Sequence, residues 1–174
     1  MGNKIFDLEK NFSSFGAYHS NPINIAIHML FSWPIFFTAI LLLDYTPPLF
    51  NLPTSTFLFL EAMSTGTLAA LLCWVCWIGS NFLATRLRFS LAWKIVLVAQ
   101  VVGWTGLSIG HGVFEGRAPA LLDNLAQGLI MGPYFVLFEA LQKFFGYEPY
   151  PGFHASAQTM IEAEINEWRE KKQK

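Results

Sequence analysis

Charged side chains are scarce in this 174-residue chain, and it has no excess of positive charge. Only 13% of its residues are charged, against roughly 25% in an ordinary soluble domain. The formal net charge of −1 provides no basic face to neutralise phosphates, which argues against nucleic acid as a partner. Hydrophobic residues make up 53%, with seventeen Phe and six Trp suited to lipid-facing helices and membrane interfaces. The composition indicates an integral membrane protein.

Cysteine is almost absent as well. Cys73 and Cys76 are the two in the chain, and they lie inside an apolar run without a βαβ pattern or a second cysteine pair. Buried inert thiols are therefore favoured over a disulfide framework or a redox motif. The N-terminus is polar and the first apolar run is too long for a signal peptide, so we expect none to be cleaved.

The apolar residues are gathered into four runs, and a bilayer core needs about 20 residues for a helical crossing. The runs cover residues 23–43, 57–78, 91–110 and 121–145. The fourth is the weakest because it contains Asp123 and Glu139. The sequence thus predicts an all-α integral membrane bundle of about four apolar helices within one membrane domain, residues 1–146.

Amphipathic segments flank this domain. Residues 3–18 carry apolar side chains at helical spacing, which predicts a short helix lying in the headgroup region. Residues 147–174 are expected to form a cytosolic tail with a short surface helix from about Ser156. Glycines at 103, 106 and 110 would allow the third apolar helix to pack closely against a neighbour.

Lysine and arginine counts predict the orientation of the helices. Both tails and the connection around Arg86 and Arg88 are basic, whereas the 44–56 loop has neither residue type. Four spans with both termini in the cytosol fit these counts. Lys171 and Lys172 resemble the dilysine retrieval signal of endoplasmic-reticulum membrane proteins, which favours that membrane.

One stretch at the start of the first apolar run contains unusual polar residues. Pro22 suits the first turn of a helix, with Ser20 or Asn21 as its cap. Asn24 and His28 then lie four residues apart on one face. Because no charged residue follows until after Leu43, an imidazole enters the membrane, where ionisable groups are functional-site candidates. The alternative is a histidine that only hydrogen-bonds a neighbouring helix.

A second stretch, residues 100–119, collects its polar groups on one helical stripe. The members of the stripe are Gln100, Trp104, Ser108, His111 and Glu115. His111 and Glu115 are four residues apart, so both could hold one ion from the same helix face. A helix end at the membrane interface would explain Glu115 equally well, but it explains Gln100 and Ser108 poorly.

Histidine itself is rare, and three of the four occur in these two stretches. They are His19, His28 and His111, while His154 follows a Pro-Gly turn in the tail and is expected to be exposed. Three neutral imidazoles, with or without Glu115, would make a nitrogen-rich site suited to Fe(II) and O₂ chemistry or to zinc. Four histidines are too few for the clustered boxes of membrane di-iron desaturases and hydroxylases.

The four-span arrangement conflicts with such a site. If the first and third apolar helices both cross from the cytosolic side, His28 and His111 lie about 25 Å apart at 1.5 Å per residue. Either one segment does not cross, or the histidines do not share a ligand. The charge counts depend on few residues, so we expect the simple four-span arrangement to fail before the shared site does.

The two stretches also carry a family resemblance. The pattern YH-x4-N-x3-H-x5-P at residues 18–34, followed by GHGVFEGRAPALLDNL at 110–125, resembles the fungal 2-hydroxy-fatty-acid dioxygenase family. Those proteins are small endoplasmic-reticulum membrane proteins of phytosphingosine breakdown. The resemblance extends from about Phe6 to Gly146, and the histidines of the family match His19, His28 and His111.

The resemblance implies an enzyme that uses Fe(II) and O₂ for α-oxidation. A 2-hydroxy fatty acid would lie among the apolar helices and lose one carbon by cleavage between C1 and C2. His19, His28 and His111 would hold the metal, and Asn24, Gln100 or Glu115 would orient the imidazoles. Glu115 is also a candidate catalytic residue or a further metal ligand.

Two other functions remain open from the residues alone. One is a non-catalytic membrane assembly factor or lipid-binding protein whose histidines only pair helices. The other is a zinc-dependent lipid hydrolase, which would work without oxygen, although no serine nucleophile motif supports it. Oligomeric state, substrate chain length and the fate of the excised carbon cannot be derived from the sequence.

Overall fold

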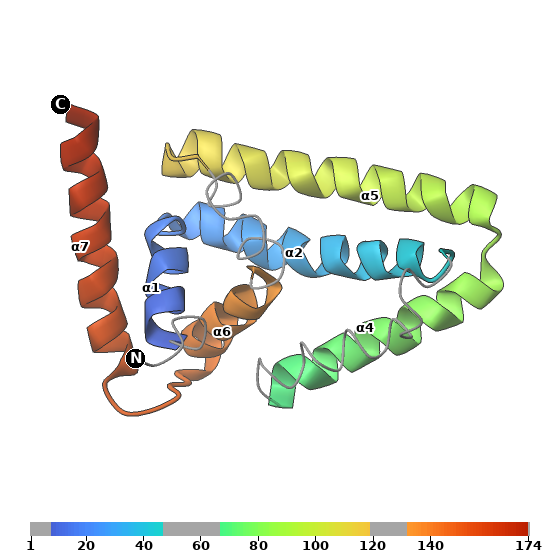
Figure 1. The fold of residues 1–174 in the computed structure, drawn as a ribbon, viewed down its shortest axis with the longest axis horizontal. Coiled ribbons are helices and arrows are strands. Elements are labelled where there is room, and N and C mark those ends of the chain that lie inside the picture. Colours follow the sequence, from blue (N-terminus) through green and yellow to red (C-terminus); the bar gives the residue numbers. More distant parts are fainter. Residues whose placement is uncertain (1–7, 47–66, 119–131, 174) are drawn as a thin grey trace. The chain divides into compact units, whose positions relative to one another are not determined.

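The computed structural model describes residues 8–46, 67–118 and 132–173, and all regular secondary structure in these ranges is helical. Figure 1 shows the course of the chain. In chain order the elements are α1 (Leu8–Ala17), α2 (Pro22–Leu43), α4 (Thr67–Arg86), α5 (Phe89–Ile109), the π-helical turn η2 (Gly110–Glu115), α6 (Gly132–Phe145) and α7 (Phe153–Gln173). The predicted all-α fold is confirmed.

Three helices in the described part of the chain are long and apolar enough to cross a membrane: Pro22–Leu43, Leu68–Arg86 and Phe89–Glu115. Many large apolar side chains of the second and third of these helices are exposed, as in Trp74, Val75 and Val101. Such faces need a lipid environment, because contact between this apolar surface and water is unfavourable in free energy. Of the fourth predicted run, residues 121–145, the structure describes the part from Gly132, where α6 has 14 residues. Residues 57–66 and 121–131 of the predicted runs lie outside the described residues.

The chain forms two compact units. Unit 1 comprises residues 1–29 and 108–174, and unit 2 comprises residues 30–107. Unit 1 therefore contains α1, the start of α2, η2, α6 and α7, together with the three histidines of the two polar stretches.

The core of unit 1 is aromatic. Phe12 of α1 is 3% exposed, and its ring lies 5.2 Å from that of Phe138 in α6 and 5.4 Å from that of Phe153 in α7. Phe12 of the N-terminal helix therefore packs against aromatic partners from α6 and α7, which bury its apolar surface.

The α2 and α5 segments of unit 2 run antiparallel. A Cβ atom on Gly103 would lie 2.6 Å from Ile35 Cγ1, and one on Gly106 would lie 2.6 Å from the Phe31 ring. Later residues of α5 thus face earlier residues of α2. The predicted role of these glycines in close packing is confirmed.

The α4 helix, by contrast, runs parallel to α2. Phe37 packs against Gly79, and the Tyr45 hydroxyl donates to the carbonyl oxygens of Ala84 and Leu87, at 3.2 and 2.9 Å. The turn between α4 and α5 therefore lies at the C-terminal end of α2. The charge counts had assigned this turn to the same membrane side as the N-terminal tail, and that assignment cannot hold if α2 crosses the membrane. The four-span arrangement also required α2 and α5 to run parallel, whereas their contacts are antiparallel.

Candidate metal centre

The turn between α1 and α2 places two histidines close together. After α1, backbone bonds from Tyr18 to Phe15 and from His19 to Gly16 close a tight turn. Asn21 then caps α2, because its Oδ1 accepts from the Ile23 N–H at 2.9 Å, and Pro22 occupies the first helical position as expected. This turn folds His19 back toward α2 and thus toward His28.

Three imidazoles meet at one point in unit 1. The ring centroids of His19 and His28 are 4.3 Å apart, and the ring centroid of His111 lies 4.8 Å from that of His19 and 4.9 Å from that of His28. One ring nitrogen from each of the three lies within 4.8 Å of the other two. All three side chains are buried, with exposures of 8%, 7% and 4% for His19, His28 and His111. The structure therefore brings together the three histidines that the sequence singled out.

Backbone carbonyls set the orientation of two of these rings. His19 Nδ1 lies 2.8 Å from the Phe15 carbonyl oxygen, and His28 Nδ1 lies 2.9 Å from that of Asn24. Because a carbonyl oxygen only accepts, each Nδ1 carries the proton and each Nε2 has a free lone pair. Metal-ligating histidines commonly use one ring nitrogen in this way and bind the ion with the other.

The remaining nitrogens provide a test of whether a metal fits. His19 Nε2 and His111 Nδ1 are buried and have no hydrogen-bond partner. Unpaired buried nitrogens cost free energy, and an ion bound by them would remove that cost. Three neutral imidazoles are a donor set that suits zinc, iron or copper. The three histidines could hold a metal ion.

Electrostatics agree with this donor set. Burial lowers the pKa of the His19 imidazole well below its ordinary value, and the adjacent His28 and His111 rings lower this pKa further. The ring is therefore neutral at pH 7, which is the protonation state that metal binding requires.

Glu115 lies beside the centre but is hydrogen-bonded elsewhere. Its Oε1 accepts from the Ser20 N–H at 2.9 Å and from the Ser20 hydroxyl at 2.5 Å. Its Oε2 accepts from the Asn21 N–H at 3.0 Å and from Asn24 Nδ2 at 3.1 Å. Two of the predicted site residues, Asn24 and Glu115, are thus in direct contact with each other.

The segment that carries His111 and Glu115 is not α-helical. The sequence predicts a continuous α-helical stripe, but α5 ends at Ile109 and η2 follows with the wider π-helical turn. Gly110 packs directly against the Asn24 side-chain oxygen, where a Cβ atom would collide. Gly116 then ends the helix at φ 65° and donates to the His111 carbonyl oxygen. π-Turns of this kind are frequent at functional sites.

The other predicted candidates have different described partners. Gln100 belongs to unit 2, where its Nε2 donates to the Ile35 carbonyl and to Thr38 Oγ1 and its Oε1 accepts from Trp104. His154 is half-buried, and its Nε2 lies 3.1 Å from the Tyr147 carbonyl oxygen. Cys73 and Cys76 are not joined by a disulfide.

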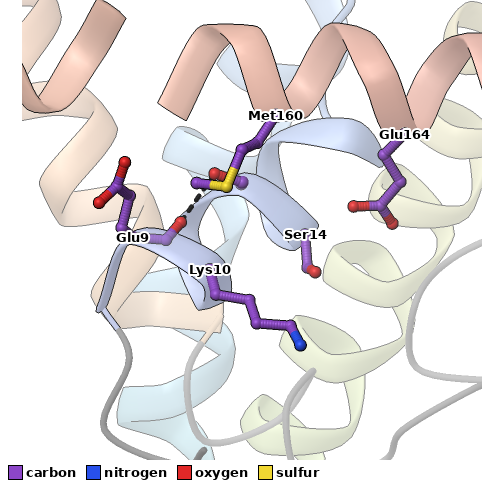
Figure 2. A pocket seen from close by; sticks show the side chains of 6 residues that line it. Glu9, Lys10, Ser14, Met160 and Glu164 are labelled. Carbon is purple, nitrogen blue, oxygen red and sulfur yellow. Dashed lines mark hydrogen bonds between the residues drawn. The ribbon is translucent and has the colours of Figure 1, made fainter. Parts of the chain in front are cut away.

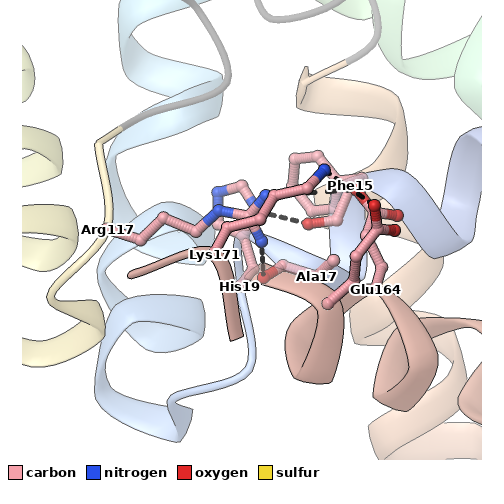
Figure 3. A network of polar contacts seen from close by, with 7 residues as sticks. Phe15, Ala17, His19, Arg117, Glu164 and Lys171 are labelled. Atoms are coloured by element: carbon pink, nitrogen blue, oxygen red, sulfur yellow. Dashed lines mark hydrogen bonds and ion pairs between the residues drawn. The ribbon is translucent and has the colours of Figure 1, made fainter. Parts of the chain in front are cut away.

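Arg117 is a residue whose role the sequence analysis missed. Its guanidinium donates to the Ala17 carbonyl at 3.0 Å, lies 3.6 Å from the Tyr18 ring centroid and is 4.0 Å from Glu164 of α7 (Figure 3). Arg117 therefore connects α7 to the residues that immediately precede His19. The one available signal was its place in the GHGVFEGRAP motif.

Two hollows differ in lining. A narrow cleft beside the cluster is lined by His19 and His28, by apolar residues and by Glu139. The apolar part of its lining consists of Phe15, Gly16, Ile25, Met29 and Val136. The hollow between α1 and α7 is lined mostly by polar side chains, including Glu9, Lys10 and Glu164 (Figure 2). Of these two, the cleft at the histidines has the more apolar lining.

Comparisons with known proteins agree with this geometry. No solved structure matches the chain. The chain is 34% identical over 157 residues to a protein of Saccharomyces cerevisiae named 2-hydroxy-palmitic acid dioxygenase MPO1, covering 86% of this chain and 87% of the yeast protein. Residues 5–144 match the family described as 2-hydroxy-palmitic acid dioxygenase Mpo1-like, and the chain belongs to this Mpo1-like family.

Proposed function

We propose that this protein is an Fe(II)-dependent dioxygenase that shortens 2-hydroxy fatty acids by one carbon during the breakdown of phytosphingosine and related lipids. The observation that carries the proposal is the meeting of His19, His28 and His111 in one buried cluster. The name of the yeast relative supports the substrate class, since it describes a dioxygenase of 2-hydroxy-palmitic acid.

His19, His28 and His111 would hold the iron. Bound there, Fe(II) would supply the redox chemistry that O₂ requires and open positions for the substrate. The contribution of the chain is to keep three neutral nitrogens facing one point and to exclude bulk water from them. The Phe15 and Asn24 carbonyls fix two of the rings before the metal arrives.

The cleft beside His19 and His28 is where we place the first carbons of the acyl chain. Its apolar lining would remove the chain from water, and its position would bring C1 and C2 next to the histidines. The overall change balances with O₂ as the oxidant: a 2-hydroxy acid and O₂ give the acid that is one carbon shorter and the elements of CO₂ and water.

We place the enzyme in the endoplasmic-reticulum membrane with both termini in the cytosol. The resemblance to endoplasmic-reticulum proteins supports the location, and the three apolar helices support membrane integration. Because α5 runs antiparallel to α2, the chain returns along α5 toward the end at which α2 begins.

The test is anaerobic loading of purified protein with Fe(II) and 2-hydroxypalmitate, followed by O₂ and mass analysis of the product. We expect the fatty acid that is one carbon shorter, and we expect His28→Ala to abolish both its formation and iron binding. His154→Ala is the matched control and should keep both. Turnover without O₂ would favour a zinc hydrolase, and undiminished turnover in His28→Ala would refute the shared iron site.

A further inference from the structure

The three histidines of the candidate centre come from three different segments. His19 lies in the turn after α1, His28 in the second turn of α2, and His111 in η2, which follows α5. A metal site needs its ligands held within fractions of an ångström. Some contact must therefore keep η2 in register with the start of α2.

Glu115 makes that contact. One carboxylate has about four acceptor sites, and four donors use them here: the Ser20 N–H, the Ser20 hydroxyl, the Asn21 N–H and Asn24 Nδ2. The donors lie at the N-terminal end of α2, where unpaired backbone N–H groups and the helix dipole favour a negative charge. A fifth bond, from Asn21 Nδ2 to the Phe114 carbonyl at 2.9 Å, reinforces the connection.

Two of the residues that bind the Glu115 carboxylate are directly connected to histidines of the centre. Ser20 directly follows His19. Asn24, which is fully buried, accepts a hydrogen bond from His28 Nδ1 through its backbone carbonyl. The Asn24 side-chain nitrogen also donates to the Tyr18 carbonyl at 3.3 Å. Since both partners of this nitrogen are acceptors, the orientation of the Asn24 amide is fixed.

The same occupancy argues against Glu115 as a metal ligand. Coordination through either oxygen would break at least one of the four hydrogen bonds and leave a donor unpaired at the start of α2. The carboxylate also does not belong to the group of ligand atoms that the three histidines form.

We propose that Glu115 is a positioning residue: its carboxylate joins the start of α2 to η2 and thereby holds His19, His28 and His111 in ligating register. We call Glu115 with Ser20, Asn21 and Asn24 the carboxylate clamp. This inference depends on the metal site of the proposed function, but not on the identity of the metal or of the substrate.

The test is a Co(II) titration of the purified, metal-free protein in detergent, followed by absorption spectroscopy. Glu115→Gln keeps the shape of the side chain but places an amide N–H₂ against donors. We expect Co(II) affinity to fall by about 10–100-fold, the usual effect of losing a residue that orients ligands. At saturating Co(II) the spectrum should equal that of the wild type, because the three ligands are the same.

Controls separate the outcomes. Glu170→Gln, an exposed glutamate of α7, should leave Co(II) affinity unchanged. Ser20→Ala removes only the hydroxyl donor and should lower affinity less than Glu115→Gln, which keeps the test available if Glu115→Gln does not fold. An altered spectrum of Glu115→Gln at saturating Co(II) would identify Glu115 as a ligand and overturn the proposal. Unchanged Co(II) affinity in Ser20→Ala, and in Glu115→Gln if that variant folds, would overturn it as well. Wild-type protein that binds Co(II) but does not turn over 2-hydroxypalmitate after loading with Fe(II) would count against the oxygenase and not against the clamp.

Discussion

The two imidazoles His19 and His28 are held by carbonyl oxygens four residues earlier in the chain. Each therefore presents its Nε2 lone pair without help from the metal, so part of the entropic cost of ordering the ligands is met during folding. The Asn24 amide belongs to the same arrangement, because its backbone orients His28 while its side chain contacts Glu115. Asn24 therefore contributes both to the packing of η2 against α2 and to the orientation of a candidate metal ligand.

Glu139 is the acid that lines the cleft with His19 and His28. Burial raises the pKa of its carboxyl, and the nearby Lys143 and His154 partly offset that increase. When the pKa of a carboxyl is raised in the folded state, the free energy of unfolding of the protein falls as pH rises through that pKa. Below the pKa of the unfolded chain, about 4.3, this loss is absent.

We therefore expect Glu139→Gln to melt at a higher temperature than the wild type near pH 8 and at the same temperature near pH 4. At this chain length each kcal/mol corresponds to about 2–4 °C. Thermal unfolding in detergent across this pH range measures the difference. Equal melting temperatures at both pH values would mean that the carboxyl is not desolvated; Glu170→Gln, at an exposed site, should show no difference at either pH.

Val136 tests the placement of the acyl chain at the residue scale. It is buried on α6 and lines the cleft next to the histidines. Val136→Phe should fill part of the cleft and lower kcat/KM for 2-hydroxypalmitate at least about tenfold, which is about 1.4 kcal/mol of transition-state stabilisation. Bound iron, measured on the same sample, should stay at the wild-type level. Val101→Phe, on an exposed face of α5, is the matched control; an equal loss in both variants would contradict a chain-binding role for the cleft.

At the scale of elements, the sequence predicts the apolar helices better than their ends. Charge-free runs such as residues 23–43 can be read directly, and the Asn21-Pro22 start of α2 follows from capping chemistry. The π-helical turn η2 could not be predicted, because it is held by long-range contacts of Gly110 and Glu115 with Asn24 and Ser20. The aromatic partners of Phe12 were missed for the same reason, since they come from distant helices.

The packing of α5 on α2 gives a prediction at this scale. Gly103→Val would place a branched side chain where Ile35 lies, since even a Cβ atom would be 2.6 Å from Ile35 Cγ1. We expect a loss of about 1–3 kcal/mol in the free energy of unfolding, the usual cost of overpacking. Denaturant titration of the protein in mixed micelles measures it. Thr105→Val, at an exposed position on the same helix, should cost much less, and similar costs for both would argue that the two helices do not touch here.

At the scale of the whole molecule, the direction of the helices decides whether the histidines can meet. Charge counts placed the N-terminal tail and the Arg86–Arg88 turn on one side of the membrane, and with four alternating spans His28 and His111 would have been far apart. The antiparallel contacts of Ile35 with Gly103 and of Phe31 with Gly106 remove that conflict. The paired motifs predicted that the three histidines lie close together, as they do; each motif contributes several residues to that prediction, whereas each connection contributes only one or two charges.

This direction makes a prediction about membrane sides. Tyr45 bonds to the turn between α4 and α5, so Thr46 and Arg88 lie at the C-terminal end of α2, about 33 Å from Pro22 for a 22-residue helix. Ile23, at the start of the same helix, is 49% exposed. In a background with Cys73 and Cys76 replaced by alanine, a membrane-impermeant maleimide applied to sealed microsomes should label Thr46→Cys and Arg88→Cys from one side and Ile23→Cys from the other. Labelling of all three from the same side would show that α2 does not cross the bilayer, and the histidine cluster would then belong to a protein lying on one membrane face.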